Sequence, residues 1–129
     1  SAATIRPGIQ YLNCGGYDTV VDTGIRAQVL RFTAAGTPGS SPAPAAVDDG
    51  NINKQLASFG TGVYSVEPTY TPSTWLLSFA MNFRNTYHWM AQSEKYQLRA
   101  PATAANGLGL RSITAIAADD YAGGITWEE

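Results

Sequence analysis

The chain has 129 residues, of which 44% are hydrophobic and only 14% are charged, and its net charge is −2. Intrinsic disorder requires low hydrophobicity and high charge, so this composition excludes a disordered chain. We expect no nucleic-acid binding, because the eight basic residues are scattered singly from Arg6 to Arg111 and form no basic patch. No run of about 20 apolar residues is present, so no membrane span is expected either.

The length indicates one domain, covering residues 1–129, which is long enough to bury a single hydrophobic core. Cys14 is the only cysteine, which excludes an internal disulfide and a zinc site built from several thiolates. The favoured interpretation of Cys14 is a small half-buried residue. The alternative, a catalytic thiolate, would need a base, and His88 is the only histidine.

Strands are expected early in the chain because β-branched and aromatic residues lie there between glycines and aspartates. Residues 17–21 and 24–32 are predicted to pair as a hairpin across a turn at 22–24. In the second of these runs apolar and polar residues alternate, as in a half-buried strand. Residues 62–67 alternate less cleanly and are predicted to form a further strand that ends before Pro68.

Residues 34–46 are distinct in composition, being mostly small residues interrupted by three prolines. Such a segment builds no core, so a long surface loop is expected. The alternative is an arm that becomes ordered against a neighbouring subunit. That alternative makes Pro38, Pro42 and Pro44 candidate interface residues.

The stretch from residue 73 to 100 contains no glycine or proline and holds two of the three tryptophans. We predict a strand over 74–83, a turn at 84–86, and then a helix or a second strand up to Leu98. One face of the predicted strand carries Trp75, Leu77, Phe79, Met81 and Phe83. A helix is the competing interpretation, with Pro72 at its first position and aromatic residues four apart.

Short elements are expected after Pro101. Residues 102–109 are predicted to form a loop, 110–117 a buried strand or a short helix that ends at 123–124, and 125–127 a last strand. The sequence therefore predicts a mainly β fold, a sandwich or barrel-like single domain with one or two short helices. An α+β fold is the alternative.

The most metal-like pattern is a polar turn that precedes a short helix predicted over 51–59. Side-chain oxygens at Asp49, Asn51 and Asn53 have the alternate spacing of a calcium loop. The glycine and the glutamate that such a loop requires further on are missing. We therefore interpret these residues as a polar turn that caps the helix, and expect no metal or other cofactor.

Catalytic motifs are missing as well. The chain has no Gly-x-Ser-x-Gly elbow, no phosphate-binding glycine loop and no His-x-x-x-His pair. The adjacent Asp119 and Asp120 would point to opposite faces of an extended chain, so they are not expected to share a substrate. With one histidine, the commonest general base is also scarce. The sequence does not indicate an enzyme.

The remaining signal is aromatic, because seven Tyr and three Trp outnumber four Phe. Tyrosine and tryptophan combine an apolar body with a polar tip, which suits protein interfaces and sugar-binding platforms. We expect Trp75 and Phe79 to be core residues. The candidate interface or ligand contacts are Tyr70, Tyr87, His88 and Trp89.

Two functions fit these features. The first is a non-enzymatic structural subunit that associates with copies of itself, such as a coat or decoration protein of a virus or phage particle or a subunit of a surface filament. Low charge permits dense packing of such copies. The alternative is a small carbohydrate-binding, lectin-like module. Ser1 fits either removal of an initiator Met or cleavage of a signal peptide; a virion or an extracellular surface is the favoured location.

Overall fold

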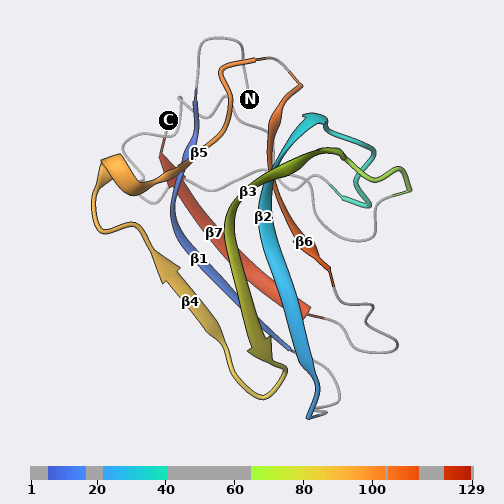
Figure 1. The fold of residues 1–129 in the computed structure, drawn as a ribbon, viewed down its shortest axis with the longest axis vertical. Coiled ribbons are helices and arrows are strands. Elements are labelled where there is room, and N and C mark those ends of the chain that lie inside the picture. The colour runs from blue at the N-terminus through green and yellow to red at the C-terminus, as the bar shows by residue number, and fades with distance from the viewer. Residues whose placement is uncertain (1–5, 17–21, 41–64, 104, 114–120, 129) are drawn as a thin grey trace.

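The structure of the protein is a computed structural model in which two antiparallel sheets pack face to face (Figure 1). It describes residues 6–16, 22–40, 65–103, 105–113 and 121–128. The predicted mainly β fold is confirmed, and the described strands form a sandwich that does not close into a barrel. Within the described ranges the only helical element is a single 3₁₀ turn, η2 (Glu94–Tyr96). No helix there is long and apolar enough to cross a membrane.

The first sheet is built on β1 (Gly8–Gly16), which is paired along both of its edges. β4 (Tyr87–Met90) and β5 (Leu98–Arg99) pair with one edge, and β7 (Tyr121–Glu128) pairs with the other. The sequence pattern did not predict β1, because the β1–β7 register shifts between Ile9 and Tyr11 and breaks the strict alternation.

The second sheet places β2 (Gly24–Ala34) between β3 (Thr69–Asn82) and β6 (Gly107–Ser112). The strand expected over 24–32 is confirmed and runs two residues further, to Ala34. β3 begins before Pro72, which an edge strand tolerates because the missing N–H does not interrupt an interior ladder.

The strand interpretation of the glycine-free stretch is confirmed, and a turn follows where it was predicted: the N–H of Asn85 donates to the carbonyl of Asn82 at 2.9 Å. After the turn the chain continues as β4 and not as a helix. The loop prediction over 102–109 is wrong at its end, because residues from Gly107 onward pair with β2. The alternative of a short helix that ends at 123–124 is wrong too, since both glycines lie within β7, Gly123 close against the backbone of Asn13 in β1 and Gly124 close against its side chain.

Four other predicted elements fall wholly or partly outside the described residues. They are the strand over 17–21, the helix over 51–59, the first half of 62–67 and the end of 110–117. In the described part of the strand predicted over 62–67, Val66 forms only an isolated bridge with Thr37.

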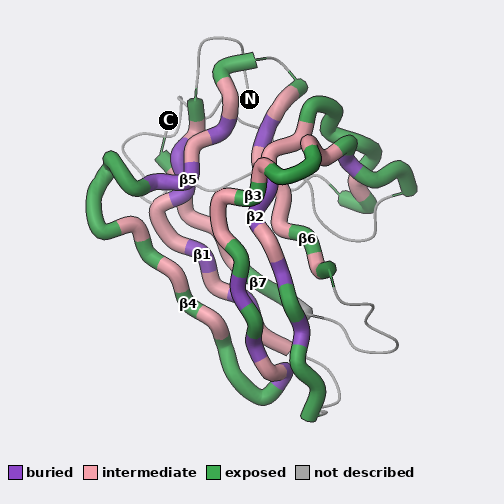
Figure 2. Tube along the Cα trace, in the orientation of Figure 1, coloured by how far each residue is buried: buried purple, intermediate pink, exposed green. Residues whose placement is uncertain are grey.

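The hydrophobic core fills the space between the two sheets, and its largest fully buried side chains are Leu12, Ile25, Val29 and Cys14. Figure 2 shows buried positions recurring along β1, β2 and β3, where one side of each strand faces the other sheet. Phe79 is buried in this core as predicted and stacks on Tyr87 with ring centroids 3.9 Å apart.

Trp75 was expected in the core and lies outside it, with 56% of its surface exposed. The reason is a register shift between β2 and β3. Leu77 pairs with Val29, but Trp75 pairs with the next residue, Leu30. One extra residue therefore interrupts the alternation, and Trp75 leaves the inward face.

The core predicts a sharp contrast between two substitutions. Leu12→Ala removes a side chain that is 0% exposed and should lower the free energy of unfolding by about 2–5 kcal/mol. Val66→Ala, at a side chain that is 59% exposed, should change it by less than about 0.5 kcal/mol. Chemical denaturation of both variants measures the difference, and equal losses would contradict this account of the core.

Candidate functional site

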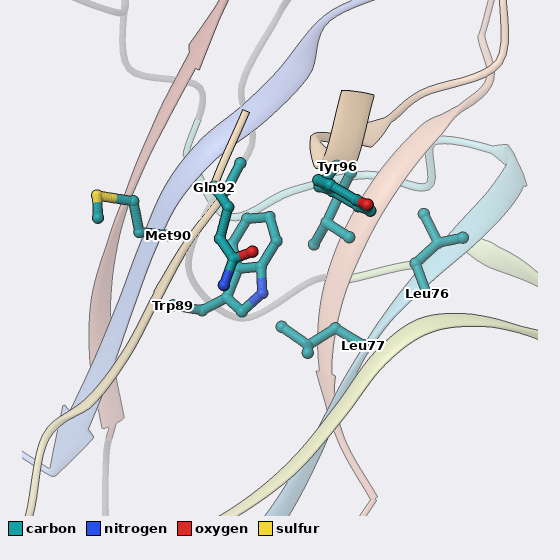
Figure 3. Close-up of a pocket in the computed structure, with 8 residues that line it drawn as sticks. Leu76, Leu77, Trp89, Met90, Gln92 and Tyr96 are labelled. Atoms are coloured by element: carbon teal, nitrogen blue, oxygen red, sulfur yellow. The ribbon is translucent and has the colours of Figure 1, made fainter. Parts of the chain in front are cut away.

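The candidate site is an apolar hollow at the lateral seam between the two sheets. β3 and β4 follow one another in the chain but belong to different sheets, and each lies at the edge of its sheet. Between them is a hollow of about 420 Å³, which we call the seam hollow. The residues labelled at it in Figure 3 are Leu76, Leu77, Trp89, Met90, Gln92 and Tyr96.

The lining of the seam hollow is uncharged and partly open to solvent. Figure 3 places the indole of Trp89 among the lining side chains, and Trp89 also packs against the core. Met90 and Tyr96 at the rim are 70% and 60% exposed. Tyr96 exposes an aromatic ring beside the hollow, whereas Met90 lies opposite Tyr11 on the outer face of the sheet and points away from Trp89 (Figure 3).

The open edge of β4 borders the seam hollow. The N–H of Ala91 donates to the carbonyl of Gln10 at 2.8 Å, which continues the register in which Met90 lies opposite Tyr11. Backbone groups alternate in direction along an antiparallel strand. The N–H and C=O groups of Trp89 therefore face β1, and those of His88 and Met90 face away from it. No described strand pairs with that outer edge (Figure 1).

The three adjacent candidates on β4 are divided between the two faces of the sheet. Tyr87 and Trp89 lie opposite Cys14 and Leu12 and pack against the core. His88 lies on the outer face, where its Nδ1 is hydrogen-bonded to the Tyr11 hydroxyl.

The sheet therefore separates His88 from Cys14, and the two do not form a nucleophile–base pair. Burial raises the pKa of the Cys14 thiol from its ordinary 9.0 to about 11, which makes the reactive thiolate scarcer at neutral pH. These two observations argue against a catalytic thiolate, and Cys14, with 1% of its surface exposed, is a fully buried core residue and not the half-buried one that was expected.

Tyr70 belongs to a second feature, an aromatic platform on the outer face of the β3–β2–β6 sheet, away from the seam hollow. It pairs with Phe32, and the two rings meet edge to face with centroids 6.5 Å apart. The guanidinium carbon of Arg111 lies 5.4 Å from the Tyr70 ring centroid, a cation–π contact. Arg111 also lies 4.0 Å from the Glu67 carboxylate.

Two glycines of β6 make room for these rings. A Cβ atom at Gly109 would lie 2.7 Å from the Tyr70 hydroxyl oxygen, and one at Gly107 would overlap the Phe32 ring. Such contacts are too short for a real Cβ atom. The two rings can therefore lie across β6 only at glycine positions, which have no side chain. The exposed Trp75, paired with Leu30, continues the platform along β3.

The remaining sequence candidates are not brought to either feature. Pro38 is half-buried beside Thr37, whose N–H donates to the carbonyl of Val66 at 2.8 Å. Pro42 and Pro44 lie outside the described residues, and so does the acidic turn of Asp49, Asn51 and Asn53. Elsewhere, within the part of the chain that the structure describes, no group of three or more His, Cys, Asp or Glu could hold a metal ion.

Sequence reasoning missed Leu76, Tyr96 and Met90 at the seam hollow. Met90 is next to Trp89, and a strand interpretation of 87–90 would have put these two on opposite faces. The position of Leu76 depends on the β3 irregularity, and that of Tyr96 on the η2 turn, which brings it beside β4. Neither position has a signal in the hydrophobic pattern.

Cys14 predicts a specific loss of stability at alkaline pH. Its pKa is higher in the folded chain than in the unfolded one, so its contribution is complete below about pH 9 and is lost as the pH rises to about 11. The free energy of unfolding of Cys14→Ala should fall less over this interval than that of the unsubstituted chain. Urea unfolding at each pH measures this, and parallel decline of both proteins would contradict it.

Comparison of the chain with protein-family models, with curated proteins and with solved structures found no match. Two surface features of the structure bear on function: the seam hollow with the open edge of β4, and the aromatic platform around Tyr70.

Proposed function

We propose that the protein is a non-enzymatic structural subunit that works by associating with copies of itself, as a coat or decoration protein of a virus or phage particle or as a subunit of a surface filament. The observation that carries the proposal is the open, uncharged edge of β4 beside the apolar seam hollow. On this proposal the protein is located in a virion or at an extracellular surface.

No proline or charged side chain lies along the outer edge of β4, and no strand among the described residues pairs with it. Sheet edges are usually protected by Lys, by Pro or by a covering segment. From residue 85 to residue 93 the sequence reads Asn-Thr-Tyr-His-Trp-Met-Ala-Gln-Ser, with no charged residue and no proline. An edge of this kind, next to exposed apolar side chains, favours pairing with another strand.

The composition supports the same proposal. Single soluble domains usually have about 25–35% charged residues on their surface, and this chain has 14% overall. Protein interfaces are depleted in charge and enriched in Tyr, Trp and Met at their centres. The surroundings of the seam hollow, with Trp89, Met90 and Tyr96, have this composition.

If the chain associates with itself through the seam hollow, charged substitutions there should cause the assembly to dissociate. The unsubstituted chain should sediment as a large symmetric species at micromolar concentration. The double variant Met90→Lys, Tyr96→Lys should associate at least about tenfold more weakly, because burying two unpaired ammonium groups costs more than about 1.4 kcal/mol. Analytical ultracentrifugation over a concentration series measures both.

The matched control is Val66→Lys, because Val66 and Tyr96 are almost equally exposed, at 59% and 60%, and Val66 does not line the seam hollow. This variant should assemble like the unsubstituted chain. A chain that stays monomeric at every concentration would overturn the proposed function.

The aromatic platform favours a second candidate function, a lectin-like module. Tyrosine and tryptophan rings stack on the apolar faces of sugars, and nearby polar groups orient the hydroxyls. Tyr70, Phe32 and Trp75 supply the rings, while Arg111 and Glu67 supply charged groups at one side. The ring that is freest to stack is Trp75, at 56% exposure.

Glycan binding predicts that Trp75→Ala abolishes retention on immobilised glycans without unfolding the protein, because Trp75 is exposed and lies outside the core. Trp89→Ala is the informative contrast. It should lower stability, because Trp89 packs against the core, and should leave glycan retention intact. A broad glycan panel with no binding to the unsubstituted chain would exclude this function.

A further inference from the structure

We infer that two copies of this chain pair through β4, antiparallel across a two-fold axis at Trp89, so that the two β1-centred sheets become one continuous sheet. This inference rests on the proposed self-association and names the surface and the register that perform it.

The backbone of β4 selects the register. The N–H and C=O groups of His88 and Met90 face the open edge, whereas those of Trp89 face β1. In an antiparallel pair, opposed residues whose groups face each other exchange two hydrogen bonds. With Trp89 opposite Trp89 of the other copy, His88 lies opposite Met90 at both ends of the pair. A register centred on His88 or on Met90 would place only one pair of residues that exchange two backbone hydrogen bonds within the strand, whereas the register centred on Trp89 places two.

The side chains agree with this register. Residues opposite each other in a sheet lie on the same face, so both Trp89 side chains lie on the inner face, beside the two seam hollows. Both β3–β2–β6 sheets then lie on the same side of the joined sheet. The two apolar seams face each other across the axis and cover each other, which removes the exposed ring of Tyr96 from water, whereas the Met90 side chain lies on the outer face of the joined sheet.

Charges at the ends of the uncharged segment are complementary under the same symmetry. Arg84 and Glu94 are the first charged residues before and after it, and each lies five positions from Trp89. A two-fold axis at Trp89 brings the Arg84 end of one copy to the Glu94 end of the other. Both residues are exposed, and Lys95 follows Glu94 at the same end. A parallel arrangement would bring like ends together.

The other edge at the seam is less suited to pairing. β3 contains Pro72, and Ser73 has a positive φ of 60°. Its register with β2 shifts at three places between Val29 and Ala34. Prolines and bulges of this kind are the usual devices that prevent edge pairing.

Mixed disulfide cross-linking tests the inference. In the proposed register the Cα atoms of His88 and of Met90 in the other copy would be about 5.5 Å apart, within the range of about 4.4–6.8 Å that a disulfide spans. Two His88 residues would lie diagonally, beyond the limit of about 7 Å. Mixing His88→Cys protein with Met90→Cys protein under mild oxidation should therefore yield mainly the mixed dimer.

The experiment uses the full chain, with one variant carrying a mass tag so that mass spectrometry separates mixed from identical dimers. Both substituted side chains are exposed, so the fold should persist, and circular dichroism checks it. The native Cys14 does not need to be replaced in these variants, because only 1% of its surface is exposed and it is not accessible for cross-linking. The matched control is a mixture of Ser78→Cys and Ala80→Cys, two exposed residues of β3 whose backbone groups also face outward, and it should give no excess of mixed dimer.

Each outcome separates the inference from the proposed function. An excess of mixed 88–90 dimer supports the pairing. Identical dimers in excess, or equal yields from the β3 control, overturn it. If the unsubstituted chain sediments as an assembly and neither mixture cross-links, the β4 pairing is wrong while self-association stands. If the unsubstituted chain is a monomer at all concentrations, the proposed function fails first.

Discussion

The structure depends on the double pairing of β1. Its backbone groups alternate between β4 on one edge and β7 on the other, while its side chains alternate between the core and the outer face. Leu12 and Cys14, both almost completely buried, face the second sheet. A strand hydrogen-bonded on both edges and packed on one face has little freedom to move, so it determines the position of every other strand of its sheet.

The register with β1 determines which backbone N–H and C=O groups of β4 bond to β1 and which face the open edge. Because Trp89 is bonded to β1, His88 and Met90 present their backbone groups outward, and because Trp89 lies opposite Leu12, its indole faces the second sheet. The open edge and the seam hollow are therefore two consequences of one register. A slip by one residue would turn the His88 and Met90 side chains inward and the Trp89 side chain outward, which would remove the seam hollow and present the backbone groups of Tyr87 and Trp89 at the open edge instead.

Irregularities in the second sheet have a similar influence on the aromatic residues. Shifts between β2 and β3 take Trp75 out of the core and place Tyr70 opposite Phe32 on the outer face. The two β6 glycines then allow the rings to lie across the neighbouring strand. Where the alternation is regular, at Phe79 and Met81, the aromatic and apolar residues are buried. Bulges thus decide which rings are available at the surface.

Composition and local pattern predicted the mainly β class, the strand β2, the strand character and turn of the central stretch, and the burial of Phe79. These features are properties of short windows of sequence, such as alternation, turn residues and β-branched content. The same windows misplaced Gly107, Gly123 and Gly124, because glycine is typical of turns and here serves close approach between strands. They also failed to detect β1, where a bulge interrupts the alternation.

The candidate site could be predicted only in part. The sequence singled out Tyr70, Tyr87, His88 and Trp89 by residue type. It could not show that Tyr70 lies apart from the other three, that His88 and Cys14 lie on opposite faces, or that Leu76 and Tyr96 meet Trp89. Those relations depend on which strands pair, in which register and on which edge. They are settled by contacts between residues far apart in the chain, and a local pattern has no information about them.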